Sequence, residues 1–472
     1  MSGKNKSAYP FIIVIGTLAC LVGLSQLNVN LTYKGFQFRK LDLLSELRSP
    51  DKNNPDQEEI LTAANNGGSK HFSKDDSTTT TTTTGTNAAN PDHTHDFLSY
   101  AGILEYSSPE AADNPGLKRF LEALKDLKAG KRNKVRIAYF GDSMIEGDLI
   151  TSDLRDSLQH FFGGAGVGFV PVTSIVASFR TTITHTFSRD WKDYHYKNSP
   201  PSNVQLGLSG HTFLPGSNSW VKYSPVKKPL LDKFDEISVL FGQGNNGTIT
   251  INDRPYTLNG NQTVNRLDLK QDTASPSLLM SYSGNTMPLY GVCFESGNGV
   301  YVDNYSFRGI SGIELGHLSA AMIRQMQEER HYDLIVMHYG ANVLWKPELT
   351  DYSWYEKPMT KVVDSLRQDL PGTSFLIIGT ADKSYRKADK YVTAPGVPAL
   401  LKVQHDLAAI HGTAYWNLYA AMGGEGSMVK WVEGDTVMAN KDYTHFNRTG
   451  AAKVGALLYK ALMNEYRLAQ QP

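Results

Sequence analysis

A serine that directly follows a strongly apolar segment is the first residue of this chain whose setting favours chemistry. Residues 135–140 have the composition of a buried β-strand, and Gly141, Asp142 and Ser143 come straight after them. A serine just past the end of a buried strand is presented for nucleophilic attack. Its hydroxyl is a poor nucleophile at neutral pH, so a base and an acid that orients this base must come from elsewhere in the chain.

Both partners stand close together near the end of the chain. Asp442 and His445 are three residues apart, and a helical pattern follows them. An imidazole can take the proton of the serine, and a carboxylate can hold the imidazole in the required tautomer. The alternative is that both residues merely precede a helix, because residues 447–450 open the last helical segment and acids favour helix N-termini.

Two further positions offer hydrogen-bond donors for a negatively charged oxygen. Asn342 follows the strand predicted for residues 333–339, and its side-chain amide can donate. Gly312 follows a short strand predicted for residues 301–305, and it offers a backbone N–H with no side chain in the way. Donors of this kind stabilise the tetrahedral intermediate of acyl transfer.

In order and residue type, these positions resemble the SGNH (GDSL-like) hydrolase superfamily, whose four blocks contribute Ser, Gly, Asn and His in this order. The resemblance implies that Ser143 is the nucleophile and that His445, oriented by Asp442, is the general base. It also implies an oxyanion hole formed by the Ser143 and Gly312 N–H groups and the Asn342 amide. The chemistry requires no metal and no organic cofactor.

Longer segments around the blocks resemble bacterial peptidoglycan O-acetylesterases of this superfamily. These segments are residues 117–124, 166–171 and 420–427, and the likeness covers about residues 96–468. One departure is that Val343 follows the block-three asparagine, where the family often has an acidic residue.

The resemblance implies a serine esterase that removes O-acetyl groups from a cell-wall glycan, with peptidoglycan as the expected substrate. Two alternatives stay open. The same triad could transfer the acetyl group to a hydroxyl of an envelope polysaccharide, because an acyl-enzyme does not dictate whether water or an alcohol accepts the acyl group. A chain with this fold could also be a non-catalytic, glycan-binding wall protein.

The segments that carry these residues alternate between helix and strand, as in a three-layer α/β/α fold with a parallel sheet. In such sheets, ligands bind at the carboxyl ends of the strands, where Ser143, Gly312 and Asn342 are all predicted to lie. The pattern predicts helices over residues 313–330, 360–368 and 399–410, and strands over residues 333–339, 374–379 and 414–418.

The hydrolase fold is predicted to be interrupted. Residues 176–303 lose the helical periodicity and contain alternating stretches typical of antiparallel strands, so we expect an inserted β-sandwich, similar to a carbohydrate-binding module, between hydrolase parts 96–175 and 304–472. Its aromatic residues would either stack on sugar or fill the core of the sandwich. They are Trp191, Tyr194, Tyr196 and Trp220.

The N-terminal region predicts attachment to a membrane. Residues 8–28 are apolar over about the length that spans a bilayer, and we expect an uncleaved signal anchor rather than a cleaved signal peptide. Residues 49–95 are polar and Thr-rich, typical of a disordered linker. The expected location is the bacterial cell envelope, with an inner-membrane anchor and the catalytic domain in the periplasm.

Composition excludes several other kinds of site. Basic and acidic side chains number 47 each, so nothing favours nucleic acid as a partner. The two cysteines, Cys20 and Cys293, do not imply a disulfide framework. His93 and His95 lack further ligands at metal-binding spacing and belong to the linker, and His338 is expected in the core. The expected partners are therefore an acetylated cell-wall glycan and the membrane.

Overall fold

The computed structural model describes residues 32–33, 36–37, 96–108, 115–198, 200–232, 234–270 and 277–471. The predicted anchor (8–28) and linker (49–95) lie outside these residues, and none of the helices described is long and apolar enough to cross a membrane. The chain divides into two units, Met1–Thr84 and Gly85–Pro472. In the first unit, β1 (Thr32–Tyr33) pairs with β2 (Phe36–Gln37) in antiparallel fashion.

A six-stranded sheet forms the centre of the second unit, and its strand order is β16-β4-β17-β18-β21-β3. The first five strands run parallel, whereas β3 pairs with β21 in antiparallel fashion, so the predicted parallel sheet is in fact mixed. The strands are β3 (Ile103–Glu105), β4 (Lys134–Gly141), β16 (Gly299–Ser306), β17 (Leu334–His338), β18 (Ser374–Gly379) and β21 (Ala414–Asn417).

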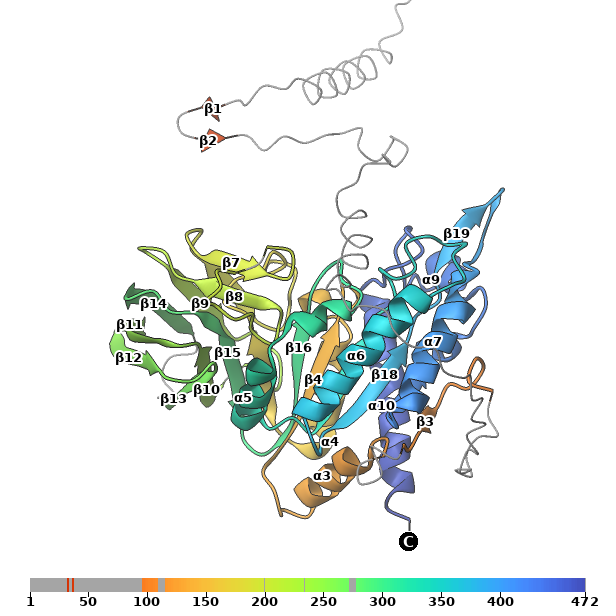
Figure 1. Cartoon of the computed structure of the whole chain (residues 1–472), viewed down its shortest axis with the longest axis horizontal. Coiled ribbons are helices and arrows are strands. Elements are labelled where there is room, and N and C mark those ends of the chain that lie inside the picture. The colour runs from red at the N-terminus through yellow and green to blue at the C-terminus, as the bar shows by residue number, and fades with distance from the viewer. Residues whose placement is uncertain are drawn as a thin grey trace, which may run out of the picture. The chain divides into compact units, whose positions relative to one another are not determined.

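Helices cover both faces of this sheet and bury the two sides of each strand. In β4, Ile137 and Tyr139 belong to one hydrophobic cluster, whereas Ala138 and Phe140 belong to the other. Figure 1 shows α6 and α7 in front of the sheet. The first cluster includes α3 (Lys118–Lys128), α4 (Thr151–Phe162), α8 (Leu418–Met422), α9 (Ser427–Glu433) and α10 (Arg448–Leu468); the second includes α5 (Ala320–Arg330), α6 (Ser353–Asp369) and α7 (Gly396–Ile410). The predicted α/β class is confirmed.

The structure differs from the predicted secondary structure at residues 313–330 and at residues 384–393. The helix expected over residues 313–330 is divided into a short 3₁₀ helix, η3 (Ile313–His317), and α5, because Ser319 adopts an extended conformation and caps α5 by accepting a hydrogen bond from the Met322 N–H. Residues 384–393, for which no element was expected, form a hairpin of β19 (Ser384–Lys387) and β20 (Lys390–Thr393). Their polar sequence has no buried face that periodicity could reveal.

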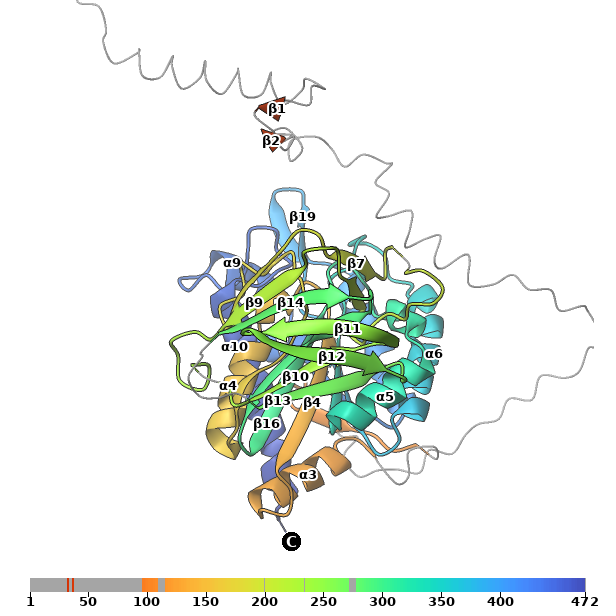
Figure 2. The ribbon, with the colours of Figure 1, turned by 90° about the vertical axis from the view of Figure 1, so that its left-hand side faces the viewer.

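The segment between β4 and β16 contains two antiparallel sheets. One has the order β13-β10-β15-β8-β7, with β5 also paired to β15, and the other has the order β12-β11-β14-β9-β6. Figure 2 looks onto β9, β14, β11 and β12. The strands are β5 (Ala165–Val170), β6 (Thr184–Phe187), β7 (Lys192–His195), β8 (His211–Leu214), β9 (Trp220–Ser224), β10 (Glu236–Phe241), β11 (Gly244–Ile251), β12 (Arg254–Gly260), β13 (Asn265–Lys270), β14 (Leu278–Gly284) and β15 (Leu289–Ser296).

The two antiparallel sheets share one hydrophobic cluster, to which both contribute side chains such as Val239 and Ile249. Among the aromatic residues singled out in this segment, Trp191 is buried and donates its indole N–H to the Trp220 carbonyl. The Trp220 side chain is exposed. Trp191 therefore packs in the core of this segment, whereas the Trp220 ring lies at the surface.

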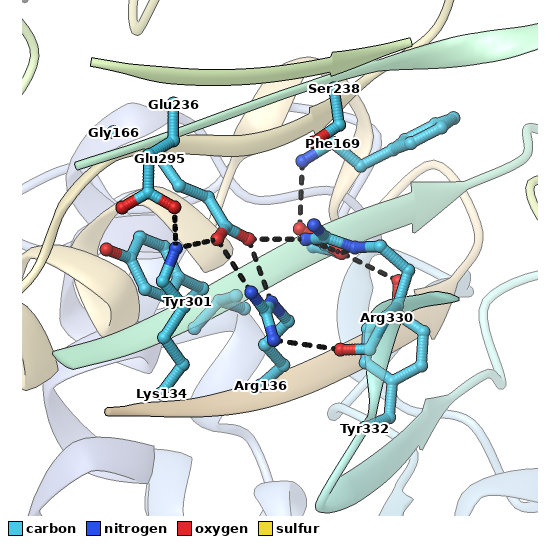
Figure 3. Close-up of polar contacts among 12 residues, drawn as sticks. Lys134, Arg136, Gly166, Phe169, Glu236, Ser238, Glu295, Tyr301, Arg330 and Tyr332 are labelled. Carbon is cyan, nitrogen blue, oxygen red and sulfur yellow. Dashed lines mark hydrogen bonds and ion pairs between the residues drawn. The ribbon is translucent and has the colours of Figure 1, made fainter. Parts of the chain in front are cut away.

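A buried cluster of charged side chains joins the antiparallel strands to the central sheet (Figure 3). Glu295 on β15 accepts hydrogen bonds from Nε and Nη2 of Arg136 on β4, at 2.9 and 2.8 Å, and from Lys134 at 2.7 Å. Arg330, at the end of α5, lies 2.8 Å from Glu295 and 2.7 Å from Asp303 on β16. Burial raises the pKa of Glu295, but Arg330 and Arg136 outweigh this effect and hold the pKa well below its ordinary value.

Glu295→Gln is expected to destabilise the protein by about 3–5 kcal/mol, because it leaves the buried Arg136 guanidinium without its carboxylate partner and leaves Arg330 paired with Asp303 alone. The ionised carboxylate stabilises the fold above the ordinary glutamate pKa of 4.5 and loses this effect as the pH falls through its lowered pKa in the folded state. The difference between wild type and variant should therefore be largest near neutral pH and shrink in strong acid. Urea unfolding at several pH values measures it.

The matched control is Glu236→Gln. Glu236 also pairs with Lys134, but its side chain is 49% exposed. Exposed pairs are worth about 0–1 kcal/mol. Equal destabilisation by both substitutions at neutral pH would contradict the importance assigned to the buried cluster.

Candidate active site

The predicted site residues follow three neighbouring strands of the central sheet. Ser143 follows β4, Gly312 follows β16 and Asn342 follows β17, and β4 lies between the other two. Because these strands are parallel, their carboxyl ends meet at one edge of the sheet. His445 comes from the loop that precedes α10, and it reaches the same edge.

A chain of hydrogen bonds links the serine, the histidine and the aspartate. Ser143 Oγ lies 2.9 Å from His445 Nε2, and His445 Nδ1 lies 2.8 Å from Asp442 Oδ2. The other carboxylate oxygen of Asp442 accepts hydrogen bonds from the backbone N–H groups of Thr444 and His445, both at 3.0 Å. This geometry allows the imidazole to take a proton from the serine hydroxyl while the carboxylate holds the ring.

The hydrogen bonds keep Asp442 ionised. Partial burial raises the pKa of its carboxyl group, but the hydrogen bonds from His445 and Thr444 outweigh this effect and lower the pKa to about 2. A carboxylate that is charged throughout the neutral range can stabilise the imidazolium that forms when His445 accepts a proton.

The loop that carries Asp442 and His445 is held in a strained backbone conformation. Tyr443, between them, has a φ of +54°, which side chains other than glycine rarely adopt. The rings of Tyr443 and Tyr391 of β20 stack with centroids 3.6 Å apart, and the Ser384 N–H donates to the Tyr443 carbonyl. The Tyr443 hydroxyl donates to Glu433. The β19–β20 hairpin, which the sequence did not predict, therefore stabilises the loop that carries Asp442 and His445.

Asp142 connects the serine loop to the asparagine loop, a role that the sequence did not reveal. Its side chain accepts hydrogen bonds from the Met144 N–H at 2.9 Å and from Asn342 Nδ2 at 3.1 Å. Burial raises the pKa of Asp142 to about 6, although both hydrogen bonds act in the opposite direction. The same Asn342 amide also donates to the Ile310 carbonyl at 2.9 Å. Asn342 is thus fixed from two sides.

Gly312 occupies a position that only glycine fits. Its φ is +99°, and a Cβ built there would lie 2.7 Å from the ring of Tyr339. Its N–H donates to the Glu314 carboxylate at 3.1 Å, as does the N–H of Ser311 at 3.0 Å. An oxyanion would therefore compete with Glu314 for the Gly312 donor, and with protein acceptors for the Asn342 donor.

Lys383 is a second residue that sequence reasoning missed, because a lysine shortly after a strand carries no signal of its own. Its Nζ donates to the carbonyl of Ala341, next to Asn342, at 3.2 Å. Burial lowers the pKa of Lys383, whereas the nearby charges of Asp442 and Asp142 raise it. A half-buried cation thus lies close to both carboxylates of the site.

The remaining histidines considered in the sequence contribute nothing to this site. His338 is buried on β17, its Nδ1 lies 3.0 Å from the Tyr139 hydroxyl, and burial lowers its pKa to about 4. It is a core residue, as predicted. His93 and His95 lie outside the described residues. Within the part of the chain that the structure describes, no group of three or more His, Cys, Asp or Glu side chains could hold a metal ion.

Comparisons with known proteins bear on the fold. No family model matches the chain, and no curated protein matches it in sequence. A solved structure described as a peptidoglycan O-acetylesterase is similar to it with a TM-score of 0.63 and 21% sequence identity, over 77% of this chain and 99% of that one.

Two further solved structures match much more weakly. A family two carbohydrate esterase from Cellvibrio japonicus has a TM-score of 0.26 and 9% identity, over 61% of this chain and 99% of that one. The acetyl xylan esterase AlAXEase has a TM-score of 0.27 and 14% identity, over 34% and 81%. Scores this low carry no structural argument. The chain has the fold of the peptidoglycan O-acetylesterase, as the resemblance in its sequence predicted.

Proposed function

We propose that this protein is a serine esterase that removes O-acetyl groups from a cell-wall glycan, and that the glycan is peptidoglycan. The observation that carries the proposal is the hydrogen-bonded chain of Ser143, His445 and Asp442 at the carboxyl edge of the sheet. The shared fold with a peptidoglycan O-acetylesterase supports the choice of substrate.

In the proposed reaction, His445 Nε2 takes the proton of Ser143 as Oγ attacks the acetyl carbonyl carbon. The bond between this carbon and the sugar oxygen then breaks, and the imidazolium gives its proton to the leaving oxygen, which becomes the free sugar hydroxyl. Water, deprotonated by His445, attacks the acetyl-enzyme and releases acetate and free serine. Asp442 stays ionised throughout, in keeping with its lowered pKa.

The oxyanion hole is proposed to consist of the Ser143 and Gly312 N–H groups and the Asn342 amide. A negatively charged carbonyl oxygen is a stronger acceptor than a peptide carbonyl, so it can draw the Asn342 amide away from Ile310. Glu314, which now accepts from Gly312, would have to give up this hydrogen bond as the oxyanion forms.

We also propose the cellular arrangement that the sequence favours. Residues 8–28 would anchor the protein in the inner membrane of a bacterium, the linker of residues 49–95 would let the enzyme reach the wall, and the catalytic domain would lie in the periplasm. The β-sandwich predicted for residues 176–303, whose last residues in fact belong to β16 of the central sheet, would act as a carbohydrate-binding-like module. Its two antiparallel sheets around one hydrophobic cluster support this part of the proposal.

Ser143→Ala should abolish the release of acetate from O-acetylated peptidoglycan, with a fall in kcat of at least about 10³-fold, because no other group replaces the nucleophile. Acetate is measured after incubation of the polymer with the enzyme. Ser157→Ala on α4 is the matched control, since Ser157 donates only to the backbone of its own helix. Full activity in the Ser143 variant would refute the assignment of the nucleophile.

The same assay separates the alternatives. Wild-type enzyme that acetylates an added sugar alcohol, with little free acetate, would indicate a transferase. Lack of activity on both the polymer and a small activated acetate ester would indicate a non-catalytic glycan-binding protein.

Asp442→Asn should lower kcat by roughly 10²–10⁴-fold, because a neutral amide neither fixes the tautomer of His445 nor stabilises its protonated form. Asp435→Asn, an exposed aspartate in the preceding segment, is the control. Steady-state kinetics with a small acetate ester report the effect directly. A loss shared equally by both variants would show that Asp442 has no special part in the reaction.

Lys383→Met should reduce kcat about tenfold and leave KM within about twofold, because the cation positions the Ala341–Asn342 loop and faces Asp142 and Asp442 without contacting substrate. Loss of this charge should also raise the pKa of Asp142 from its value of about 6, shifting any acidic inflection of kcat to higher pH. Lys387→Met, exposed on the β19–β20 hairpin, should show neither change. An unaltered kcat and pH profile in Lys383→Met would contradict this role.

A further inference from the structure

A turn near the start of the inserted antiparallel segment contacts both of the loops that carry the proposed triad. Residues 176–182 form this turn, and they connect β5 of one antiparallel sheet with β6 of the other. We refer to them as the bridging turn, to residues 141–150 as the serine loop and to residues 440–447 as the histidine loop. Ser143 lies in the second segment and His445 in the third.

On one side, a buried carboxylate of the serine loop holds the bridging turn. The Asp148 side chain is fully buried, and it accepts hydrogen bonds from Thr182 Oγ1 at 2.6 Å and from Arg180 Nη2 at 3.3 Å. Arg155 of α4 pairs with the same carboxylate. Burial raises the pKa of Asp148, but Arg155 and Arg180 outweigh this effect and hold the pKa well below its ordinary value. The link is therefore charged at neutral pH.

The serine loop has a backbone that needs support from its surroundings. Gly147, Asp148 and Ile150 have φ values of +67°, +71° and +63°. Such values are rare for residues other than glycine, and above all for a β-branched residue such as isoleucine. A Cβ on Gly147 would lie 2.5 Å from the Phe179 ring, so this ring of the bridging turn packs directly on the strained stretch. Conformations of this kind persist only where surrounding contacts hold them.

On its other side, the bridging turn is bonded to the end of the histidine loop. Arg448 is the first residue of α10 and stands three residues after His445, and Asn447 between them caps the helix. Arg448 Nη1 donates to Thr181 Oγ1 at 2.9 Å, and its Nη2 donates to the Phe179 carbonyl. The guanidinium also lies over the Phe179 ring, 4.7 Å from its centroid. One short turn is thus attached to both loops.

We propose that the bridging turn holds the serine and histidine loops at the separation that the Ser143–His445 hydrogen bond requires, and that Arg448 and Thr182 are positioning residues for the esterase reaction. The inference rests on the proposed function, in which this hydrogen bond carries the proton. Ser143 Oγ lies 2.9 Å from His445 Nε2, inside the range of about 2.6–3.2 Å that proton transfer needs. A misplacement of about 1 Å can cost about 10²-fold in rate.

Helix packing offers a competing explanation for the same separation. A Cβ on Gly455 of α10 would lie 2.8 Å from the carbonyl of Ile150, the residue before α4, so these two helices also connect the loops. If helix packing alone set the separation, changes confined to the bridging turn would leave the reaction rate unaltered. The two explanations therefore predict different kinetics.

Two substitutions weaken the two attachments. Arg448→Met removes the hydrogen bonds and the charge but keeps a long side chain, and Thr182→Val removes the hydroxyl bonded to Asp148 but keeps the shape of the side chain. Arg467→Met, exposed at the other end of α10, is the control for the first. Thr184→Val, exposed on β6, is the control for the second.

Three quantities are measured for each protein. They are kcat and KM for p-nitrophenyl acetate, the rate at which diethyl p-nitrophenyl phosphate modifies Ser143, and the urea midpoint of unfolding. In the modification, Ser143 Oγ bonds to phosphorus, p-nitrophenolate leaves and His445 takes the serine proton. This rate reports on the serine and its base without binding of a glycan.

Both kcat and the modification rate should fall about five- to tenfold in Arg448→Met and about three- to tenfold in Thr182→Val, with KM within about twofold of wild type. Both control variants should match wild type. In the double variant, the fall should be no larger than about that of the more affected single variant, because the attachments act in series. The urea midpoint of Arg448→Met should stay close to that of wild type, since this side chain is exposed.

Several results would overturn the proposal while leaving the esterase intact. Wild-type kcat in both Arg448→Met and Thr182→Val would assign the separation to helix packing. A higher KM with unchanged kcat would place the bridging turn in substrate binding instead. Fully multiplicative losses in the double variant would show two independent local effects.

A second measurement separates failure of this inference from failure of the proposed function. If wild-type protein neither cleaves the ester nor reacts with the phosphate, amide hydrogen exchange of the histidine loop decides. In this loop, the Asn440 N–H donates to the His445 carbonyl at 2.8 Å. Exchange there should be about threefold or more faster in Thr182→Val, although Thr182 is bonded to the other loop, and unchanged in Thr184→Val. Wild-type exchange in Thr182→Val would overturn the bridge itself.

Discussion

The parallel pairing of β16, β4 and β17 is the constraint on which the site depends. Its register sets Gly141 beside Ser306 on one side and His338 on the other, so three chain segments leave the sheet at the same level. The next residues of each segment carry Ser143, Gly312 and Asn342. A parallel sheet must be covered on both faces, and the helices of the two hydrophobic clusters supply this cover. Core packing therefore sets the separation of the loops that carry these three residues.

Charged side chains then hold in place the chain segments that the central sheet brings together. Glu295 and Arg330 tie the antiparallel strands to β4 and α5, so the inserted segment cannot move far without exposing unpaired charges. Nearer the site, Asp142 holds Asn342, and Lys383 lies close to Asp142 and Asp442. Charged groups of this kind are costly to bury, and here they lie beside the residues proposed to form the active site.

The inserted segment contributes more than its own core. Its turn after β7 lies against the loop that leads to Gly312, and its β7–β8 pair lines a cavity beside Phe307. The loop that leads to Gly312 and the inserted strands therefore form one continuous surface beside the proposed triad.

By itself, the sequence determined the α/β class and most strands of the central sheet, and it pointed to the four segments proposed to form the site. Most of these follow from a local pattern, an apolar run followed by glycine and a polar residue. Only the tertiary structure showed that Asp142 accepts from Asn342, 200 residues away, and that Lys383 joins them. It also showed that the Gly312 N–H donates to the Glu314 carboxylate. Hydrogen-bond partners and burial depend on which distant segments meet, and periodicity carries no record of that.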